Sequence, residues 1–185
     1  MHRSAFPLFF GKALPLAIIL LIFLLPHSLT VSGQKLSNYY TTALLDSGML
    51  YFVFPLDDFQ EEDAKSRLIF DISYLSSRDS ATVNFSYFYS SVNPAGSLTF
   101  QSGDKVTVCP VIKLFIDLEN QQKWHHRYTT TIHMSDLASF FRTVLPPEII
   151  ITTNDDPLTY RIRKNHWQKQ GKIISAILQM IEANS

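Results

Sequence analysis

The sequence has one cysteine, Cys109, among its 185 residues. No intramolecular disulfide can form, so core packing alone must hold the folded part together. Glycine is also scarce, with six residues. No glycine-rich turn precedes an expected helix, which excludes a phosphate-binding loop of the common type. The Gly-x-Ser-x-Gly elbow of many serine hydrolases does not occur in the sequence either.

An excess of charge of one sign is missing as well. The 16 basic residues are balanced by 16 acidic ones. A nucleic-acid-binding protein needs a clustered basic surface. The nearest run of basic residues, Arg161-Ile162-Arg163-Lys164, is short, and we expect it to be the solvated end of a strand. We therefore expect no nucleic-acid partner.

The N-terminus carries the pattern of a secretory leader. His2, Arg3 and Lys12 precede an apolar run, Ala13–Leu25, of 13 residues. That length is typical of a signal-peptide core of about 7–15 residues, whereas a membrane-spanning helix needs about 20. We predict a signal peptide over residues 1–33.

Cleavage after Gly33 would follow small residues at the positions that a signal peptidase recognises. The expected location is then the periplasm or cell surface of a bacterium, because an exported domain without disulfides suits that envelope. The alternative is an uncleaved anchor, Leu8–Ser28, which would make the chain a membrane-anchored assembly subunit. Contact with a membrane is expected only through that segment.

Residues 34–185 are predicted to form a single α+β domain. Arg67–Leu75 and Ala81–Ser90 alternate apolar and polar residues around a short polar turn, which predicts an antiparallel hairpin. An acidic loop is expected over Asp57–Asp63. Further strands are expected over Met49–Leu56, Ser97–Gln101, Lys105–Leu118, Lys123–Met134, Glu148–Thr153 and Leu158–Arg163.

Two amphipathic helices follow from the spacing of apolar residues. Ser135–Leu145 has Leu137, Phe140, Phe141, Val144 and Leu145 on one stripe. Asn165–Ala183 has a similar stripe that begins at Trp167. Ser135 and Asn165 are the expected N-caps. Because strands and helices do not alternate regularly, we expect a mostly antiparallel sheet with the two helices packed on one face.

Catalytic candidates are few. Cys109 could act as a nucleophile with His125 or His126 as its base. However, Cys109 lies in mid-strand before Pro110, a position that favours a buried structural thiol. A hydrolase that uses Cys109, or a carboxylate with a histidine, remains an alternative function, and we expect no cofactor.

Metal binding is not indicated. His125 and His126 are neighbours in a strand, so their side chains should point to opposite faces, with His126 inward and His125 toward water. His125 and His133 share a face but lie roughly 26 Å apart, at about 3.3 Å per residue. A metal site would need His166 or a carboxylate that the fold brings close.

Aromatic residues are the best candidates for binding. Phe88 falls on the polar face of its strand, and Tyr39 and Tyr40 precede the first expected strand. Exposed aromatics of this kind form contact surfaces for proteins or carbohydrates. The favoured function is an exported, non-enzymatic binding module for a protein or glycan. The contact surface would be the uncovered sheet face or an open edge strand.

Overall fold

The computed structural model describes residues 36–61, 66–119 and 123–184. The predicted leader, residues 1–33, and the alternative anchor, Leu8–Ser28, lie outside this part of the chain. Among the described residues, no helix is both long enough and apolar enough to cross a membrane.

Within these residues the chain forms one nine-stranded sheet in which each pair of neighbours is antiparallel. A short 3-10 helix, η1 (Leu36–Asn38), precedes it. The strands run in the order β1-β2-β3-β4-β7-β6-β5-β8-β9. Their bounds are β1 Tyr40–Leu45, β2 Gly48–Glu61, β3 Arg67–Leu75, β4 Ser80–Tyr89, β5 Ala95–Ser102, β6 Lys105–Glu119, β7 Lys123–His133, β8 Glu148–Thr153 and β9 Leu158–Arg161.

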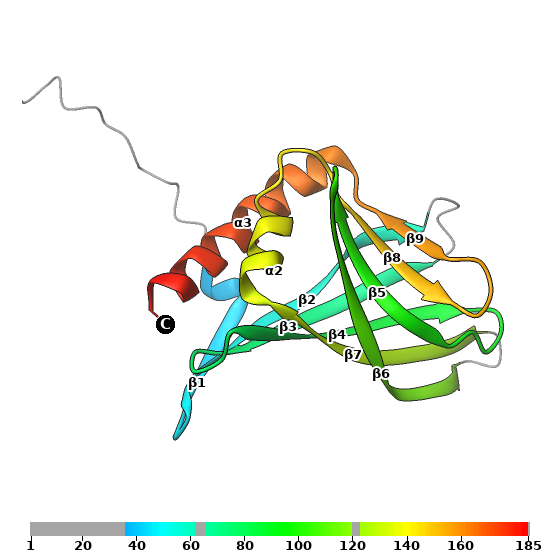
Figure 1. The fold of residues 1–185 in the computed structure, drawn as a ribbon, viewed down its shortest axis with the longest axis horizontal. Coiled ribbons are helices and arrows are strands. Elements are labelled where there is room, and N and C mark those ends of the chain that lie inside the picture. Colours follow the sequence, from blue (N-terminus) through cyan, green and yellow to red (C-terminus); the bar gives the residue numbers. More distant parts are fainter. Residues whose placement is uncertain (1–35, 62–65, 120–122, 185) are drawn as a thin grey trace, which may run out of the picture. The chain divides into compact units, whose positions relative to one another are not determined.

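The sheet closes on itself through β2. This 14-residue strand pairs with β3 on one side. On its other side it pairs first with β1 and then, at Gln60 and Glu61, with β9. Eight strands therefore form a barrel, and β1 is an additional strand beside it (Figure 1). The expected mostly antiparallel sheet is confirmed, whereas its closure was not predicted.

The predicted hairpin is confirmed in β3 and β4. Phe70 pairs with Phe85 and Ile72 with Val83. All four side chains are at most 1% exposed. The alternation in the sequence thus places one face of each strand in the core, as the period of a β-strand requires.

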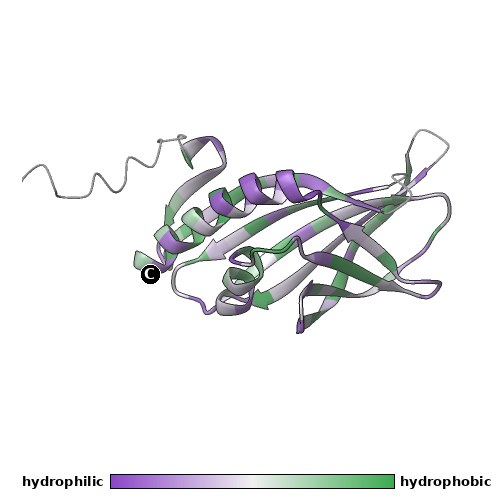
Figure 2. Ribbon diagram, turned by 90° about the horizontal axis from the view of Figure 1, so that it is seen from above, coloured by the Kyte–Doolittle hydropathy of each residue, from purple (hydrophilic) through white to green (hydrophobic). Residues whose placement is uncertain are grey.

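Two helices, α2 (Met134–Phe141) and α3 (Lys164–Ala183), pack against each other and the sheet (Figure 1). In Figure 2, hydrophilic turns mark one side of α3. Trp167 joins the two helices to the sheet through ring contacts with Phe59, Phe140 and Phe141. The predicted stripe of α3 is confirmed as buried at Trp167, Ile174, Ile177, Leu178 and Ile181.

The end of α2 corrects the predicted helix. Val144 and Leu145, expected on its buried stripe, lie beyond its end and are 86% and 68% exposed. The Trp167 indole N–H donates to the Thr143 carbonyl oxygen at 2.9 Å, which holds that residue outside the helix. Pro146 further on also disfavours helical backbone before it.

Three other local predictions are wrong. The N-caps are His133 and Arg163 rather than Ser135 and Asn165, and neither makes a side-chain cap hydrogen bond. The expected acidic loop is strand from Asp57 through Glu61, because Phe59 is fully buried and keeps β2 packed against the core. Residues 62 and 63, the end of that predicted loop, lie outside the described part of the chain.

Candidate functional site

Cys109 lies in the core on β6, opposite Leu98 of β5, with 3% of its surface exposed. Burial raises the pKa of its thiol, and the negative charge of Asp136 raises that pKa further, against a hydrogen bond with Thr130. The group is therefore held as a protonated thiol, which is a poor nucleophile.

His126 is fully buried on β7. Its Nε2 accepts a hydrogen bond from the Asn93 backbone N–H at 3.0 Å, and its Nδ1 lies 3.0 Å from the Trp124 carbonyl oxygen. Since a carbonyl can only accept, Nδ1 carries the proton of a neutral ring. The ring stacks on Tyr87 at 4.5 Å between centroids, and burial lowers its pKa. This geometry supports the loop at Asn93.

His125 occupies the opposite face, as expected, but it is not freely solvated. Its ring stacks on Phe88 at 4.7 Å and meets the edge of Phe115 at 5.1 Å. Its Nε2 is buried and has no hydrogen-bond partner among the described residues. Phe88 is half-buried, and Phe115 is 39% exposed. The fold thus brings two candidate residues, Phe88 and His125, into one aromatic cluster.

Tyr39 and Tyr40 lie beside α3 instead. Both are half-buried against the core. The Tyr40 hydroxyl donates to the Met180 sulfur at 3.2 Å, and Tyr39 lines a hollow beside Ile173. These two residues attach the start of β1 to the helix.

Beyond Tyr40, β1 is an open edge strand. Among the residues that the structure describes, it pairs with β2 alone, and residues 41–45 are all exposed. Leu44 is 80% exposed and Leu45 is 45% exposed. This strand is not among those expected from the sequence. The signal available in the sequence was the turn-forming run Asp46-Ser47-Gly48, and in the structure Gly48 has a φ of 130°.

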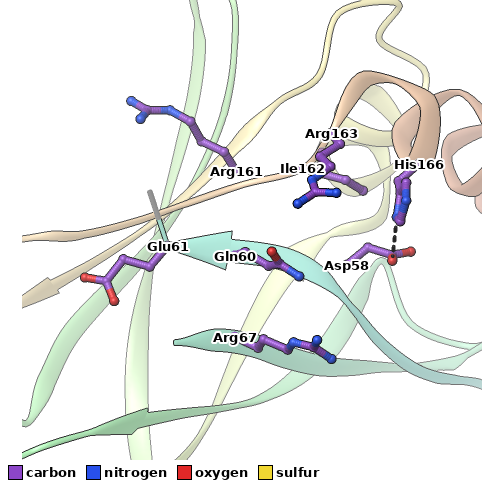
Figure 3. Close-up of a pocket in the computed structure, with 8 residues that line it drawn as sticks. All are labelled: Asp58, Gln60, Glu61, Arg67, Arg161, Ile162, Arg163 and His166. Atoms are coloured by element: carbon purple, nitrogen blue, oxygen red, sulfur yellow. Dashed lines mark hydrogen bonds and ion pairs between the residues drawn. The ribbon is translucent and has the colours of Figure 1, made fainter. Parts of the chain in front are cut away.

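A carboxylate and a histidine meet where β2 faces α3. Asp58 Oδ1 lies 3.0 Å from His166 Nδ1, and Asp58 Oδ2 accepts from Gln170 Nε2 at 3.1 Å. Figure 3 shows the Asp58–His166 contact at one side of a hollow. The two residues are 108 positions apart, and their spacing in the sequence gives no signal for the pair.

Two adjoining hollows share Asp58 and His166, and we call them the polar hollow and the apolar hollow. The polar hollow has a volume of about 630 Å³ and is lined also by Gln60, Glu61, Arg67, Arg161, Ile162 and Arg163. The apolar hollow, of about 420 Å³, is lined also by Tyr39, Leu56, Asn165, Lys169, Gln170, Ile173 and Ile174. The apolar hollow lies between β2 and α3, and the polar hollow extends from there to the pairing of β2 with β9.

In the described part of the chain, no group of three or more histidine, cysteine, aspartate or glutamate residues could hold a metal ion. No family model, no curated protein and no solved structure matches this chain.

Proposed function

We propose that the chain is an exported, non-enzymatic interaction module that binds an extended segment of a partner protein along β1. Export is inferred from the basic and apolar pattern of residues 1–33. The observation that supports binding is the open edge of β1 in a sheet whose other eight strands close on themselves.

The composition of β1 supports this use. Proteins usually protect edge strands with lysine, proline or a bulge, which prevents pairing with another chain. The six residues Tyr40–Leu45, Tyr-Thr-Thr-Ala-Leu-Leu, have no charge and no proline. Their register with β2 is regular from Tyr40 to Leu45. A regular, uncharged edge is suited to accept an added strand through backbone hydrogen bonds.

A protein segment is favoured over a glycan. A glycan would be bound by stacking on exposed aromatic faces, and one face of Phe88 is already occupied by His125. At β1 the exposed groups are instead a strand backbone with Leu44 and Leu45 beside it. These groups recognise an extended peptide with alternating apolar residues.

The test is selection of peptides from a random display library on the full chain. Selected peptides should perturb the backbone amide resonances of residues 40–45. Leu44→Lys should weaken their binding at least tenfold, because it places a charge on the strand with which the peptide must pair. The matched control is Ile112→Lys, since Ile112 is 68% exposed on β6 and pairs with β7. Failure to select peptides, or equal binding by both variants, would refute the proposal.

A hydrolase is the second candidate, and the Asp58–His166 contact is the observation that favours it. Asp58 would orient the imidazole, and His166 would take a proton from an attacking water. Hydrolysis of ester or amide substrates by the full chain, lost in His166→Gln, would establish this activity. Equal rates for the two proteins would exclude His166 as the base.

A further inference from the structure

We propose that the polar and apolar hollows form one binding site for a small amphipathic anion. Its phosphate or carboxylate group would lie in the polar hollow, and its apolar part in the apolar hollow. This site is distinct from the β1 edge and rests on different observations.

The positive field comes first from α3. Its first turn has no acidic residue, and its N-cap, Arg163, makes no side-chain cap hydrogen bond. The first N–H groups of a helix lack intrahelical acceptors, and they mark the positive end of its dipole. Arg163 and His166 line the polar hollow at this end. Helix starts of this kind favour an anionic oxygen as ligand.

Arginine side chains add to that field. Arg163 has no ion-pair partner among the described residues. Arg67 approaches Asp57 only to 3.8 Å, with both side chains about three-fifths exposed, so this pair is weak. Figure 3 shows Arg163 extending from the junction of β9 and α3 toward Gln60 of β2, with Arg67 on the neighbouring strand β3. A guanidinium can bind phosphate or carboxylate with two parallel hydrogen bonds.

The two carboxylates that line the polar hollow are either hydrogen-bonded or point away from the Asp58–His166 pair. Both oxygens of Asp58 have partners, His166 and Gln170. In Figure 3 the Glu61 side chain extends away from the Asp58–His166 pair. Arg161 pairs with Glu148 at 2.7 Å, so Arg163 and the weakly paired Arg67 are the guanidinium groups available to an anion in the polar hollow.

A buried amide supplies a second, independent observation that points to a ligand. Gln170 is only 8% exposed and lines the apolar hollow. Its Nε2 donates to Asp58, but its Oε1 is buried and has no partner. An unsatisfied buried acceptor is unfavourable, so a hydroxyl group beside the ligand's apolar part is a suitable donor for it. Leu56, Ile173 and Ile174 supply the apolar wall beside it.

The experiment measures binding of two probes, inorganic phosphate and hexyl phosphate, to the full chain by calorimetry and amide chemical shifts. Hexyl phosphate should bind at least tenfold more tightly than inorganic phosphate, because burying its chain removes several methylene groups from water. The amides of Asn165 and His166 should shift. Arg163→Gln should weaken hexyl phosphate binding about tenfold, since it removes a charge-assisted contact.

Arg78→Gln is the matched control, because Arg78 is an exposed arginine in the turn between β3 and β4. This variant should bind hexyl phosphate like the unaltered chain. Equal weakening by Arg78→Gln would show that the contact is only non-specific charge attraction. Equal affinity for the two probes would refute the role of the apolar hollow. No saturable binding at millimolar concentration would overturn the proposal altogether.

Discussion

His126 should make folding stability depend on pH. The ring is fully buried, with one nitrogen accepting from the Asn93 N–H and the other donating to the Trp124 carbonyl. Protonation of Nε2 would place its new N–H directly opposite the Asn93 backbone N–H, so the hydrogen bond between them would be lost. Replacing the ring by His126→Gln removes this titration. It also removes the stacking on Tyr87 and disturbs the Asn93 bond, so we expect a loss of roughly 2–4 kcal/mol at neutral pH.

The direction of the pH effect follows from the lowered pKa of His126. In the unfolded chain the imidazole takes up a proton near pH 6.5. In the folded chain burial lowers its pKa, so the ring is protonated only at lower pH. Below pH 6.5 the unfolded state therefore binds more protons, and the free energy of unfolding falls. The maximum slope is about 1.4 kcal/mol per pH unit for one group, and it continues down to the lowered pKa.

The assay is urea unfolding at several pH values between 7.5 and 5.0. The unaltered chain should lose more stability over this range than His126→Gln, and the difference should begin below about pH 6.5. His133→Gln is a suitable control, because the His133 side chain is 65% exposed. Parallel curves for the unaltered chain and His126→Gln would refute the assignment of a buried neutral ring.

Two further predictions concern the core. Trp167→Ala should lower the free energy of unfolding by about 3–5 kcal/mol, because it removes a ring that is 2% exposed between the helices and the sheet. Urea unfolding beside the exposed control Gln168→Ala checks this, and equal losses would contradict the packing. Cys109 should react with Ellman's reagent only on unfolding, because its thiol is buried and its pKa is raised. Rapid reaction of the folded chain at pH 8 would show that the thiol is accessible.

The hairpin of β3 and β4 could be predicted because the residues that specify it are close together in the sequence. Alternating apolar residues and a short turn specify both strands and their pairing. The stripe of α3 was predictable for the same reason, since Trp167 and Ile174 are spaced by two helical turns. The end of α2 was not, because it depends on the contact of Thr143 with Trp167, 24 residues away.

The contact of Asp58 with His166 could not be predicted from the sequence pattern for a related reason. The sequence pattern places Asp58 in a loop, and it offers His166 only as a metal ligand that the fold would have to bring close. Their contact requires both that β2 continue through Phe59 and that α3 begin at Lys164. Neither element boundary follows from local periodicity, and contacts over such separations are set by tertiary packing.

One feature of β2 accounts for both proposed surfaces. Pairing with β1 ends at Val53, and pairing with β9 begins only at Gln60. Pro55 lies between these residues and has no N–H to donate, and the register with β3 shifts on both sides of Leu56. The strand therefore bends where it leaves β1, so β1 stays outside the closed sheet with an open edge. The same interruption leaves the other edge of β2 at Asp58 next to α3, where Asp58 contacts His166 and Gln170 and lines both hollows.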